Sequence, residues 1–379
     1  FCPSPRLLAA RTLRPFPVFG APPVNRFERP ALRAMTGYTF GEQPQDGSVI
    51  KLNTNENPYA PSPAVAQALA DFDVATLRRY PSPLAEGFRE AAAALHGLTA
   101  DWVMATNGGD ELLRLLITTY LEPGQPLATT EPSYSLYPVL AAVQGCPTVA
   151  FDLEADFALP EDLGARAEAA GAGLFCLVNP HAPTGRLFTE EALENLLSQF
   201  SGVVLIDQAY GDFIDEDRKA AALALIQRHD RVLLLRTLSK GYALAGLRFG
   251  YGLAQPSLLE PMLTKTRDSY NVDAIAQTLA TAALNDQSWA RDNWAAVRRE
   301  REALRAALTA LGYEAPRSQT NFLFPTVPTA LDAAAIKEQL KSAGILVRHF
   351  PGALGQRLRI TVGTAEENAT LLAALPGAP

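Results

Sequence analysis

The sequence predicts an α/β fold, in which a mostly parallel sheet lies between helices and a second, smaller lobe is attached. Three observations lead to this prediction. Short apolar runs, typical of buried parallel strands, alternate with helical patterns. Polar side chains follow two of these runs directly, at the edge where parallel sheets bind ligands. With 379 residues, the chain can bury a large core and is expected to divide into more than one lobe.

Five apolar runs are the strand candidates of the larger lobe. They lie at residues 102–105, 126–129, 174–178, 203–206 and 232–235. Helical patterns separate them. One such helix is expected at 189–199, where Thr189 is the cap and Glu190 and Glu191 stand in the first turn. Carboxylates at this end of a helix interact favourably with its dipole.

The smaller lobe is expected to use both ends of the chain. A largely helical stretch at 279–311 leads into its C-terminal part. The strands and last helix of that part are expected at 321–324, 346–348, 358–361 and 366–375. We therefore divide the chain into an N-terminal arm with part of the small domain (24–57), a large domain (58–267), and a connecting helix with the C-terminal small domain (268–379).

Residues 1–23 stand apart from this scheme. They are rich in proline and arginine and hold no acidic residue. Such a start can be an organelle transit peptide, but the prolines would interrupt an amphipathic helix. We expect an appended or disordered segment with no role in the fold.

The composition argues against several classes of protein. A net charge of −7 does not suggest a nucleic-acid partner, and no apolar run approaches the ~20 residues of a membrane span. Cys2, Cys146 and Cys176 show no metal-binding spacing and the histidines are dispersed, so no metal is predicted. This cysteine usage fits a reducing compartment, and we expect the cytoplasm.

Lys240 lies in the most informative run of the chain. The apolar run 232–235 ends in a segment that carries Thr237, Ser239 and Arg248 around the lysine. A lysine amine can condense with an aldehyde cofactor, and hydroxyl groups beside an arginine suit that cofactor's phosphate. A turn with a solvated lysine is the ordinary alternative. The full run favours a site for pyridoxal phosphate (PLP).

Asp207 ends another apolar run, and Tyr210 follows three residues later. PLP needs a carboxylate at its pyridine nitrogen, because a protonated nitrogen makes the ring an electron sink. A tyrosine can donate to the phenolic oxygen of the ring. An aspartate after a strand is often a helix cap, but its place one crossover before Lys240 favours a cofactor ligand.

Six runs occur in the order typical of a known superfamily. They are 53–59 (NTNENPY), 107–111 (NGGDE), 131–134 (EPSY), 179–185 (NPHAPTG), 207–210 (DQAY) and 237–240 (TLSK). The chain resembles the fold-type I PLP-dependent aminotransferases from about residue 25 to 375, and within them the histidinol-phosphate aminotransferase family. The resemblance implies a large lobe with a seven-stranded type of sheet, a smaller α+β lobe and PLP as the cofactor.

The resemblance also assigns cofactor contacts. Those to the PLP phosphate would come from Gly109, Asp110, Thr237, Ser239 and Arg248. The first two open a helix, whose free amide groups suit a phosphate, and the arginine adds charge-assisted bonds. Tyr134 would stack on the PLP ring, with Tyr137 as the competing assignment.

One position departs from the family pattern. Members usually carry Asn directly before the Pro-Thr-Gly of the fourth run, where it bonds the phenolic oxygen of PLP, but here Ala182 stands there. Asn179 or His181 could reach in instead, and Asn179 is our cofactor-binding candidate. Tyr210 is the surer donor to that oxygen. Gln208, where many relatives have Glu, should point away from the ring.

Substrate recognition is assigned by the same resemblance. Arg359 would bind the terminal anion of the substrate together with Arg348, since arginine forks suit carboxylate and phosphate. Tyr38 matches a tyrosine that touches the substrate phosphate, and Asn55 is also assigned to the substrate site. Tyr59 resembles a tyrosine that reaches the partner's active site and touches its cofactor, which implies a homodimer with shared sites.

The reaction implied is transamination of L-histidinol phosphate with 2-oxoglutarate, giving imidazole-acetol phosphate and glutamate. Lys240 would move the proton as base and then as acid. An aromatic or broad-range aminotransferase is the first alternative, because the two arginines would also serve a carboxylate. A PLP decarboxylase acting on threonine phosphate is a more distant one. A PLP sensor fused to a DNA-binding domain would need a helix-turn-helix module, for which residues 1–23 are too short.

Overall fold

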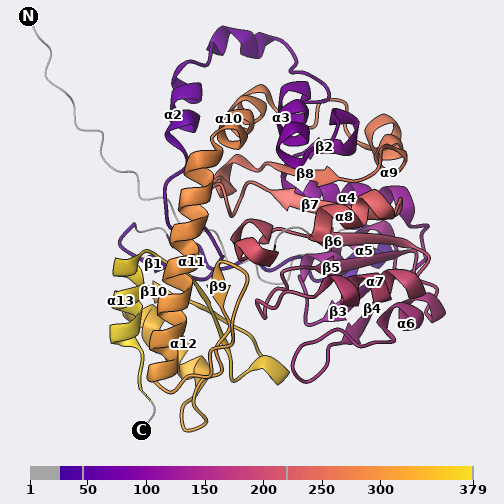
Figure 1. Ribbon diagram of the computed structural model, residues 1–379. Coiled ribbons are helices and arrows are strands. Elements are labelled where there is room, and N and C mark those ends of the chain that lie inside the picture. The colour runs from indigo at the N-terminus through magenta and orange to yellow at the C-terminus, as the bar shows by residue number, and fades with distance from the viewer. Residues whose placement is uncertain (1–25, 45–46, 219–220, 378–379) are drawn as a thin grey trace, which may run out of the picture.

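The structure is a computed structural model that describes residues 26–44, 47–218 and 221–377. It has two lobes, a larger one built on a wide sheet and a smaller one at the carboxyl-terminal end of the chain (Figure 1). Residues 1–23, for which we expected no role in the fold, lie outside the described residues. None of the helices within the described ranges has the length and apolar character needed to cross a membrane.

A seven-stranded sheet forms the centre of the large lobe, in the order β2-β8-β7-β6-β5-β3-β4. Its strands are β2 (Val103–Thr106), β3 (Leu127–Glu131), β4 (Thr148–Asp152), β5 (Leu174–Val178), β6 (Val203–Asp207), β7 (Val232–Thr237) and β8 (Gly250–Leu253). Strand β8 runs antiparallel to β2 and to β7, and the remaining pairs are parallel. The predicted α/β class with a mostly parallel seven-stranded sheet is confirmed.

All five predicted strands of this lobe are present, but the sequence did not reveal β4 or β8. Strand β4 lies at the edge of the sheet, where its residues are half-buried or exposed except Phe151, and its apolar run is only three residues long, Val149–Phe151. Strand β8 reads Gly-Tyr-Gly-Leu. Glycine disfavours strands because it has no side chain to pack, and here the strand is held between two neighbours.

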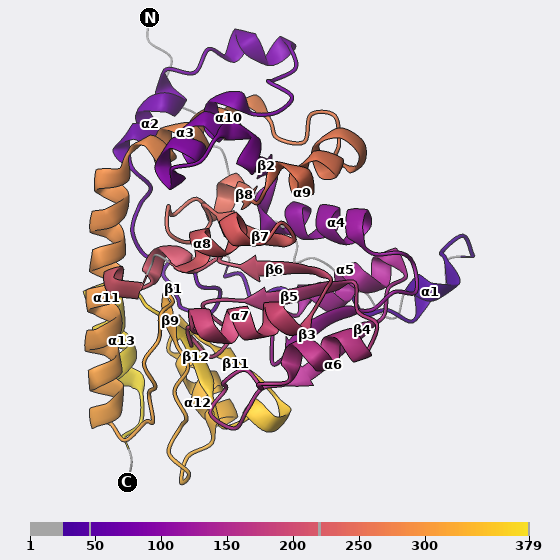
Figure 2. The same ribbon diagram turned by 45° about the vertical axis from the view of Figure 1, so that its right-hand side comes forward.

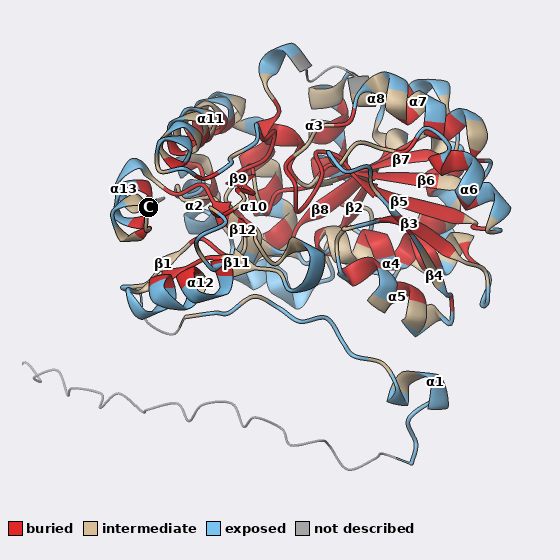
Figure 3. Ribbon diagram, turned by 90° about the horizontal axis from the view of Figure 1, so that it is seen from below, coloured by how far each residue is buried: buried red, intermediate tan, exposed pale blue. Residues whose placement is uncertain are grey.

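Helices cover both faces of this sheet, with α4 and α5 on one side and α7 and α8 on the other (Figure 3). The helices of the large lobe and its connections are α2 (Pro63–Ala70), α3 (Glu86–His96), α4 (Gly108–Tyr120), α5 (Leu136–Gln144), α6 (Leu163–Ala169), α7 (Glu190–Gln199), α8 (Ala221–Arg228), α9 (Pro256–Pro261) and α10 (Ala274–Asn285). Thr189 caps α7 as predicted, accepting a bond from the amide of Ala192. A short helix in the arm, α1 (Pro30–Arg33), lies beside α5 (Figure 2).

The small lobe holds a three-stranded sheet and a pair of short parallel strands. Their bounds are β9 (Phe322–Leu323), β11 (Arg348–His349) and β12 (Leu358–Thr361), and β1 (Ile50–Lys51) with β10 (Ile345–Leu346). Helices α12 (Ala333–Ser342) and α13 (Ala365–Ala374) complete the lobe. The pairing of β1 with β10 brings the N-terminal arm into this lobe.

The predicted helical stretch 279–311 is helical and is divided between two helices. Helix α10 ends at Asn285, and α11 (Gln287–Ala310) begins directly after Asp286, whose carboxylate caps it by accepting from the amide of Trp289. Helix α11 then runs along the side of the molecule from the large lobe to the small one (Figure 1).

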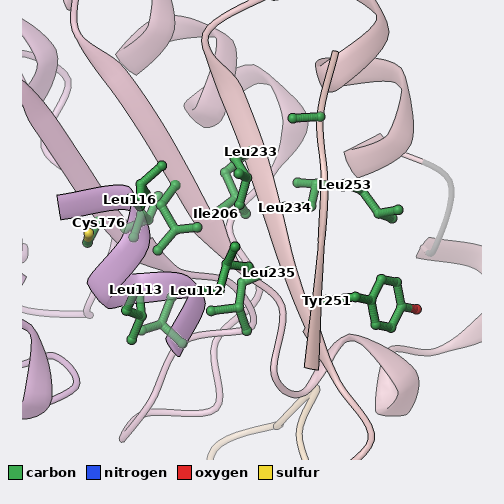
Figure 4. Close-up of a cluster of buried hydrophobic side chains, with 14 of the residues drawn as sticks. Leu112, Leu113, Leu116, Cys176, Ile206, Leu233, Leu234, Leu235, Tyr251 and Leu253 are labelled. Atoms are coloured by element: carbon green, nitrogen blue, oxygen red, sulfur yellow. The ribbon is translucent and has the colours of Figure 1, made fainter. Parts of the chain in front are cut away.

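The core of the large lobe fixes the position of one helix end. Leu112 and Leu116 of α4 lie on the side of β7 from which Leu233 and Leu235 project (Figure 4). A Cβ atom on Gly250 would lie 2.8 Å from the backbone nitrogen of Gly109, so β8 and the first turn of α4 approach as closely as backbones can. The uncapped start of α4 is thereby held beside the end of β7.

Candidate active site

A cavity of about 260 Å³ lies between the two lobes, at the carboxyl ends of β6 and β7. Most of the candidate site residues line it. They are Tyr38, Asn55, Gly109, Asp110, Tyr134, Asp207, Tyr210, Thr237, Ser239, Lys240, Arg248, Arg348 and Arg359. Residues from the arm, the large sheet and the small sheet therefore meet at one place.

Lys240 follows β7, and the N-terminal strap 53–57 holds it at both ends. Its Nζ donates to the carbonyl of Thr54 at 2.9 Å, and its own carbonyl accepts from Nδ2 of Asn57 at 2.9 Å. Burial lowers the pKa of Lys240 to about 8, and the Arg359 charge acts in the same direction. A lysine with such a pKa can give and take a proton near neutral pH.

Asp207 is the last residue of β6 and its side chain is almost completely buried. Each carboxylate oxygen accepts one bond, Oδ1 from the amide of Ala209 and Oδ2 from the hydroxyl of Tyr137, both at 2.9 Å. Burial raises the pKa of Asp207 to about 6, while these two donors act in the opposite direction. The carboxylate thus faces the cavity with its orientation fixed.

Tyr210 is held from the other side of the cavity. Nδ2 of Asn55 donates to its hydroxyl at 2.9 Å, and the backbone amide of Asn55 donates to Oγ1 of Thr361 at 3.0 Å. Burial raises the pKa of Tyr210, while the Arg359 charge lowers it. Asn55 lines the cavity, as predicted for a substrate-site residue, but its side-chain amide donates to Tyr210. In this structure Asn55 therefore orients the phenol of Tyr210.

The opposite end of the cavity suits a phosphate. Helix α4 starts there without a side-chain cap on its first amide groups, and such amides attract anions. The hydroxyl of Thr237 lies 3.0 Å from that of Ser239. Arg248 lies beside them, with Nη2 at 3.4 Å from the carboxylate of Asp110. Hydroxyls, free amides and a guanidinium are the donors that the phosphate of PLP requires.

Two arginines face each other in the small sheet. Arg348 of β11 and Arg359 of β12 are directly opposite in the antiparallel register. Like charges in that position are destabilising on their own. Within the described part of the chain, the buried Nε of Arg359 has no hydrogen-bond partner, whereas Nη2 donates to the carbonyl of Asn53. The arrangement is suited to an anion bound between the two side chains.

Two tyrosines lie over the cavity. Tyr134 lines it, and its hydroxyl lies 3.4 Å from Oδ1 of Asp110. Tyr38 of the arm meets the Tyr134 ring edge-on, with the ring centroids 5.9 Å apart. Tyr137 does not line the cavity, so Tyr134 is the ring that can stack on a planar cofactor. Gln208 points away toward Arg236, as expected.

The structure does not bring Asn179 to the cavity, which corrects our cofactor-binding assignment. Its side chain forms a two-way bond with the backbone of Phe188, with Oδ1 accepting at 2.9 Å and Nδ2 donating at 3.4 Å. The ring of His181 is equally engaged, with Thr184 and with the carbonyl of Pro132. Neither residue lines the cavity, so in this structure neither supplies the donor that is missing at Ala182.

Tyr59 also lies outside this cavity. It is half-buried and packs against the apolar cluster of the large lobe, and its amide donates to Oδ1 of Asn57. It therefore does not contribute to the cavity of its own chain. Its predicted contact with a partner subunit's site stays a prediction.

Sequence reasoning missed the residues that position the reactive ones. Asn57 and Thr54 hold Lys240, and Tyr137 and Ala209 hold Asp207. The three-residue spacing of Tyr134 and Tyr137 was a usable signal, since it places two tyrosines near each other at the start of a helix. Nothing in the sequence indicated that the second would turn to Asp207.

The residues present fit PLP, and the fit defines the class of protein. A half-buried lysine with a lowered pKa, a buried carboxylate and an uncapped helix start with hydroxyls meet in one cavity. The paired arginines add an anion site beside them. This is the site of a PLP-dependent enzyme that acts on an anionic amino compound.

Comparison with known proteins identifies the family. The sequence model of the aminotransferase class I and II family matches residues 47–375. The chain belongs to this family, whose cofactor is PLP.

Two curated relatives are histidinol-phosphate aminotransferases. The chain is 42% identical to histidinol-phosphate aminotransferase 1 of Trichormus variabilis over 355 residues, which cover 93% of this chain and 99% of that protein. It is 42% identical to the histidinol-phosphate aminotransferase of Geobacter sulfurreducens, over 92% and 98% of the two chains.

A solved structure agrees with the fold and the cofactor. The histidinol-phosphate aminotransferase of Sinorhizobium meliloti, in complex with pyridoxal-5'-phosphate, superposes with a TM-score of 0.79. It is 26% identical and covers 86% of this chain and 90% of its own.

Proposed function

We propose that this enzyme transfers the amino group of L-histidinol phosphate to 2-oxoglutarate, forming imidazole-acetol phosphate and glutamate. The observation that carries the proposal is the pair formed by Arg348 and Arg359, which face each other at the cavity. The buried Nε of Arg359 has no hydrogen-bond partner among the described residues. Such a pair suits a phosphate and also the carboxylate of the second substrate. The activity named for the two 42% identical relatives supports it.

PLP, when bound, supplies an electron sink that stabilises negative charge on the substrate carbon bearing nitrogen. The chain's residues do the rest. At pH 7 a pKa of about 8 leaves about one in ten Lys240 amines neutral, against about one in three thousand at the ordinary value of 10.5. Neutral Nζ would take the proton from that carbon and deliver it to the carbon that PLP contributes as its aldehyde, not back to the substrate.

The other residues hold the reacting groups in place. Asp207, ionised, would keep the pyridine nitrogen protonated. Tyr210, oriented by Asn55, would donate to the phenolic oxygen, and Tyr134 would cover one face of the ring. Arg348 and Arg359 would fix the substrate by its anion, so that the amine approaches Lys240 from a defined side.

One half-reaction tests the proposal. PLP-loaded protein is mixed with a single amino donor and no keto acid, and the visible absorbance of the cofactor is followed. We expect histidinol phosphate to convert the cofactor to its amino form faster than phenylalanine or tyrosine, because two arginines bind a phosphate dianion better than a monoanionic carboxylate. Faster conversion by an aromatic donor would move the enzyme to the aromatic class. Carbon dioxide released from threonine phosphate, without transamination, would identify a decarboxylase.

We further propose that two copies of the chain form the active unit. An exposed apolar group on the large lobe supports an interface. It includes Tyr80 and Tyr270, whose rings stack at 4.4 Å, and the nearby Val74 and Leu77. Apolar surface of this kind is typical of a contact with another chain. Tyr59, which does not line its own cavity, would then complete the partner's site.

Mixing two inactive or weakened variants tests the shared site. Lys240→Ala and Tyr59→Phe chains are unfolded together and refolded at equal amounts. If Tyr59 acts across the interface, each mixed dimer holds one intact site, and random pairing returns about a quarter of wild-type activity. The same mixture of Lys240→Ala with Asp207→Asn, two residues of one cavity of the same chain, is the control, in which neither site of a mixed dimer is intact and no activity should return. No recovery beyond the activity of the Tyr59→Phe chain alone, equal recovery in the control, or sedimentation as a monomer would contradict the Tyr59 assignment.

Two coarser assignments belong to the same proposal. Residues 58–267 would form the PLP-binding domain, and residues 24–57 with 268–379 the small domain and its connections. Two separate apolar clusters support a division into two lobes, and the larger cluster also includes residues of α10 such as Ala276 and Leu279, which lie beyond residue 267. We place the enzyme in the cytoplasm, since Cys146 and Cys176 are free thiols. Limited proteolysis and cell fractionation test the two assignments.

A further inference from the structure

Tyr137 has a role that the proposed reaction does not yet use. It stands in the first turn of α5, and its side chain is completely buried. Its hydroxyl donates to Oδ2 of Asp207 at 2.9 Å. It does not line the cavity, so it can act on a bound cofactor only through that carboxylate.

The surroundings of Asp207 explain why this bond matters. The other groups that face the carboxylate electrostatically are Asp110 of α4, Cys176 of β5, Tyr134 and Tyr210. None of them is a cation. Burial without a cation favours the neutral acid, and the amide of Ala209 is the other donor that opposes it. Tyr137 therefore supplies one of two bonds that favour the charged form.

The packing of Tyr137 leaves its hydroxyl little choice of partner. Its ring meets that of Tyr134 edge-on, with centroids 5.5 Å apart at 87°. Tyr134 in turn meets Tyr38 of the arm. Three tyrosines thus run from the substrate side of the cavity to the buried carboxylate, and the ring of the last is fixed by the one before it.

We propose that Tyr137 is a positioning residue, which keeps the Asp207 carboxylate ionised and aimed at the pyridine nitrogen of PLP. The proposal rests on the assignment of Asp207 as the ligand of that nitrogen. One oxygen is held by the strand end and the other by α5, so the carboxylate cannot rotate away when PLP leaves.

The first test is the affinity of the apoenzyme for PLP in Tyr137→Phe. Loss of a bond to a charged group is expected to weaken binding at pH 7 by at least about tenfold. Because the lost donor had lowered the pKa of Asp207, its removal raises that pKa above about 6 and more of the acid is neutral at pH 7. The ratio of variant to wild-type dissociation constants should therefore shrink between pH 7 and pH 9. The kcat should also fall while KM for the amino donor changes little.

Tyr313→Phe is the matched control. Tyr313 is also fully buried, but it lies in the small lobe and donates to the carbonyl of Pro376. Its replacement removes the same hydroxyl and is expected to leave the PLP dissociation constant unchanged. Equal PLP affinities and equal pH profiles for wild type and Tyr137→Phe would overturn the proposal.

A double-mutant cycle separates this proposal from the assignment beneath it. In an Asp207→Asn background, Tyr137→Phe should change PLP affinity by less than twofold, since the carboxylate on which it acts is gone. An effect as large as in the wild-type background would contradict a role through Asp207. If Asp207→Asn by itself binds PLP as well as wild type, the assignment of Asp207 fails instead.

Discussion

Replacement of Lys240 by alanine is expected to abolish transamination, with a loss of kcat of at least about 10⁴-fold. Its Nζ is held at the cavity by the carbonyl of Thr54, and burial lowers its pKa to about 8. Among the residues that line the cavity it is the amine able both to bond an aldehyde and to carry a proton near neutral pH. PLP should still bind, because the phosphate contacts at α4, Thr237 and Ser239 are untouched.

Two measurements check this expectation. Steady-state assays with histidinol phosphate give the loss of turnover, and the visible spectrum reports whether PLP is bound without a covalent bond to the chain. Lys240→Arg keeps a positive charge but no nucleophilic amine, and it should be equally inactive. Lys265→Ala, an exposed lysine of the same lobe, should leave the rate within about twofold. Substantial residual transamination in Lys240→Ala would refute the assignment.

Arg359→Ala is expected to lower kcat/KM by about 10²–10³-fold, because it removes a charge-assisted contact at a desolvated position. Burial lowers the pKa of Arg359, and the neighbouring Arg348 charge acts in the same direction. The two guanidinium groups repel each other, and a bound anion would offset this repulsion. The loss should be similar for histidinol phosphate and for 2-oxoglutarate, since both present an anion to the same place.

Variants of the neighbouring arginines show whether the loss of activity is specific to Arg359. Arg348→Ala should show a smaller loss than Arg359→Ala, because the Nε of Arg359 is the buried donor without a partner among the described residues. Arg359→Lys keeps the charge without the fork and should recover part of the activity. Arg357→Ala, two residues earlier, removes a cation that packs over Phe157 and Phe324 outside the cavity. It should leave kcat/KM nearly unchanged. A loss confined to histidinol phosphate would mean that the two substrates bind differently.

Much of the architecture followed from local sequence. Strand β5 has the bounds that its apolar pattern predicts, because residues buried on both faces of a sheet form continuous apolar runs. Strand β12 also has its predicted bounds. The placement of Asp207 and Lys240 in one cavity was equally predictable. Parallel strands end at the same edge of a sheet, so polar residues that follow neighbouring strands must meet there.

Local pattern was less reliable at short strands and at helix junctions. Strand β8 was not predicted because two of its residues are glycine. One of them, Gly250, is required because the first turn of α4 lies against its backbone. The boundary between helices α10 and α11 was not predicted, since Asp286 can continue a helix as well as cap a new one. In both cases a contact distant in sequence decides between two locally acceptable conformations.

The sequence by itself determined the class of fold, the cofactor chemistry and which lysine, aspartate and arginines are the candidates for the site, because these depend on residue type and on order along the chain. Only the tertiary structure decided where individual side chains turn. Asn179 turns to Phe188 and away from the cavity, Arg348 and Arg359 come directly opposite each other, and Tyr137 reaches Asp207 across 70 positions of sequence. The hydrogen-bond partner of a side chain depends on which groups folding brings near it, and the local sequence does not specify those groups.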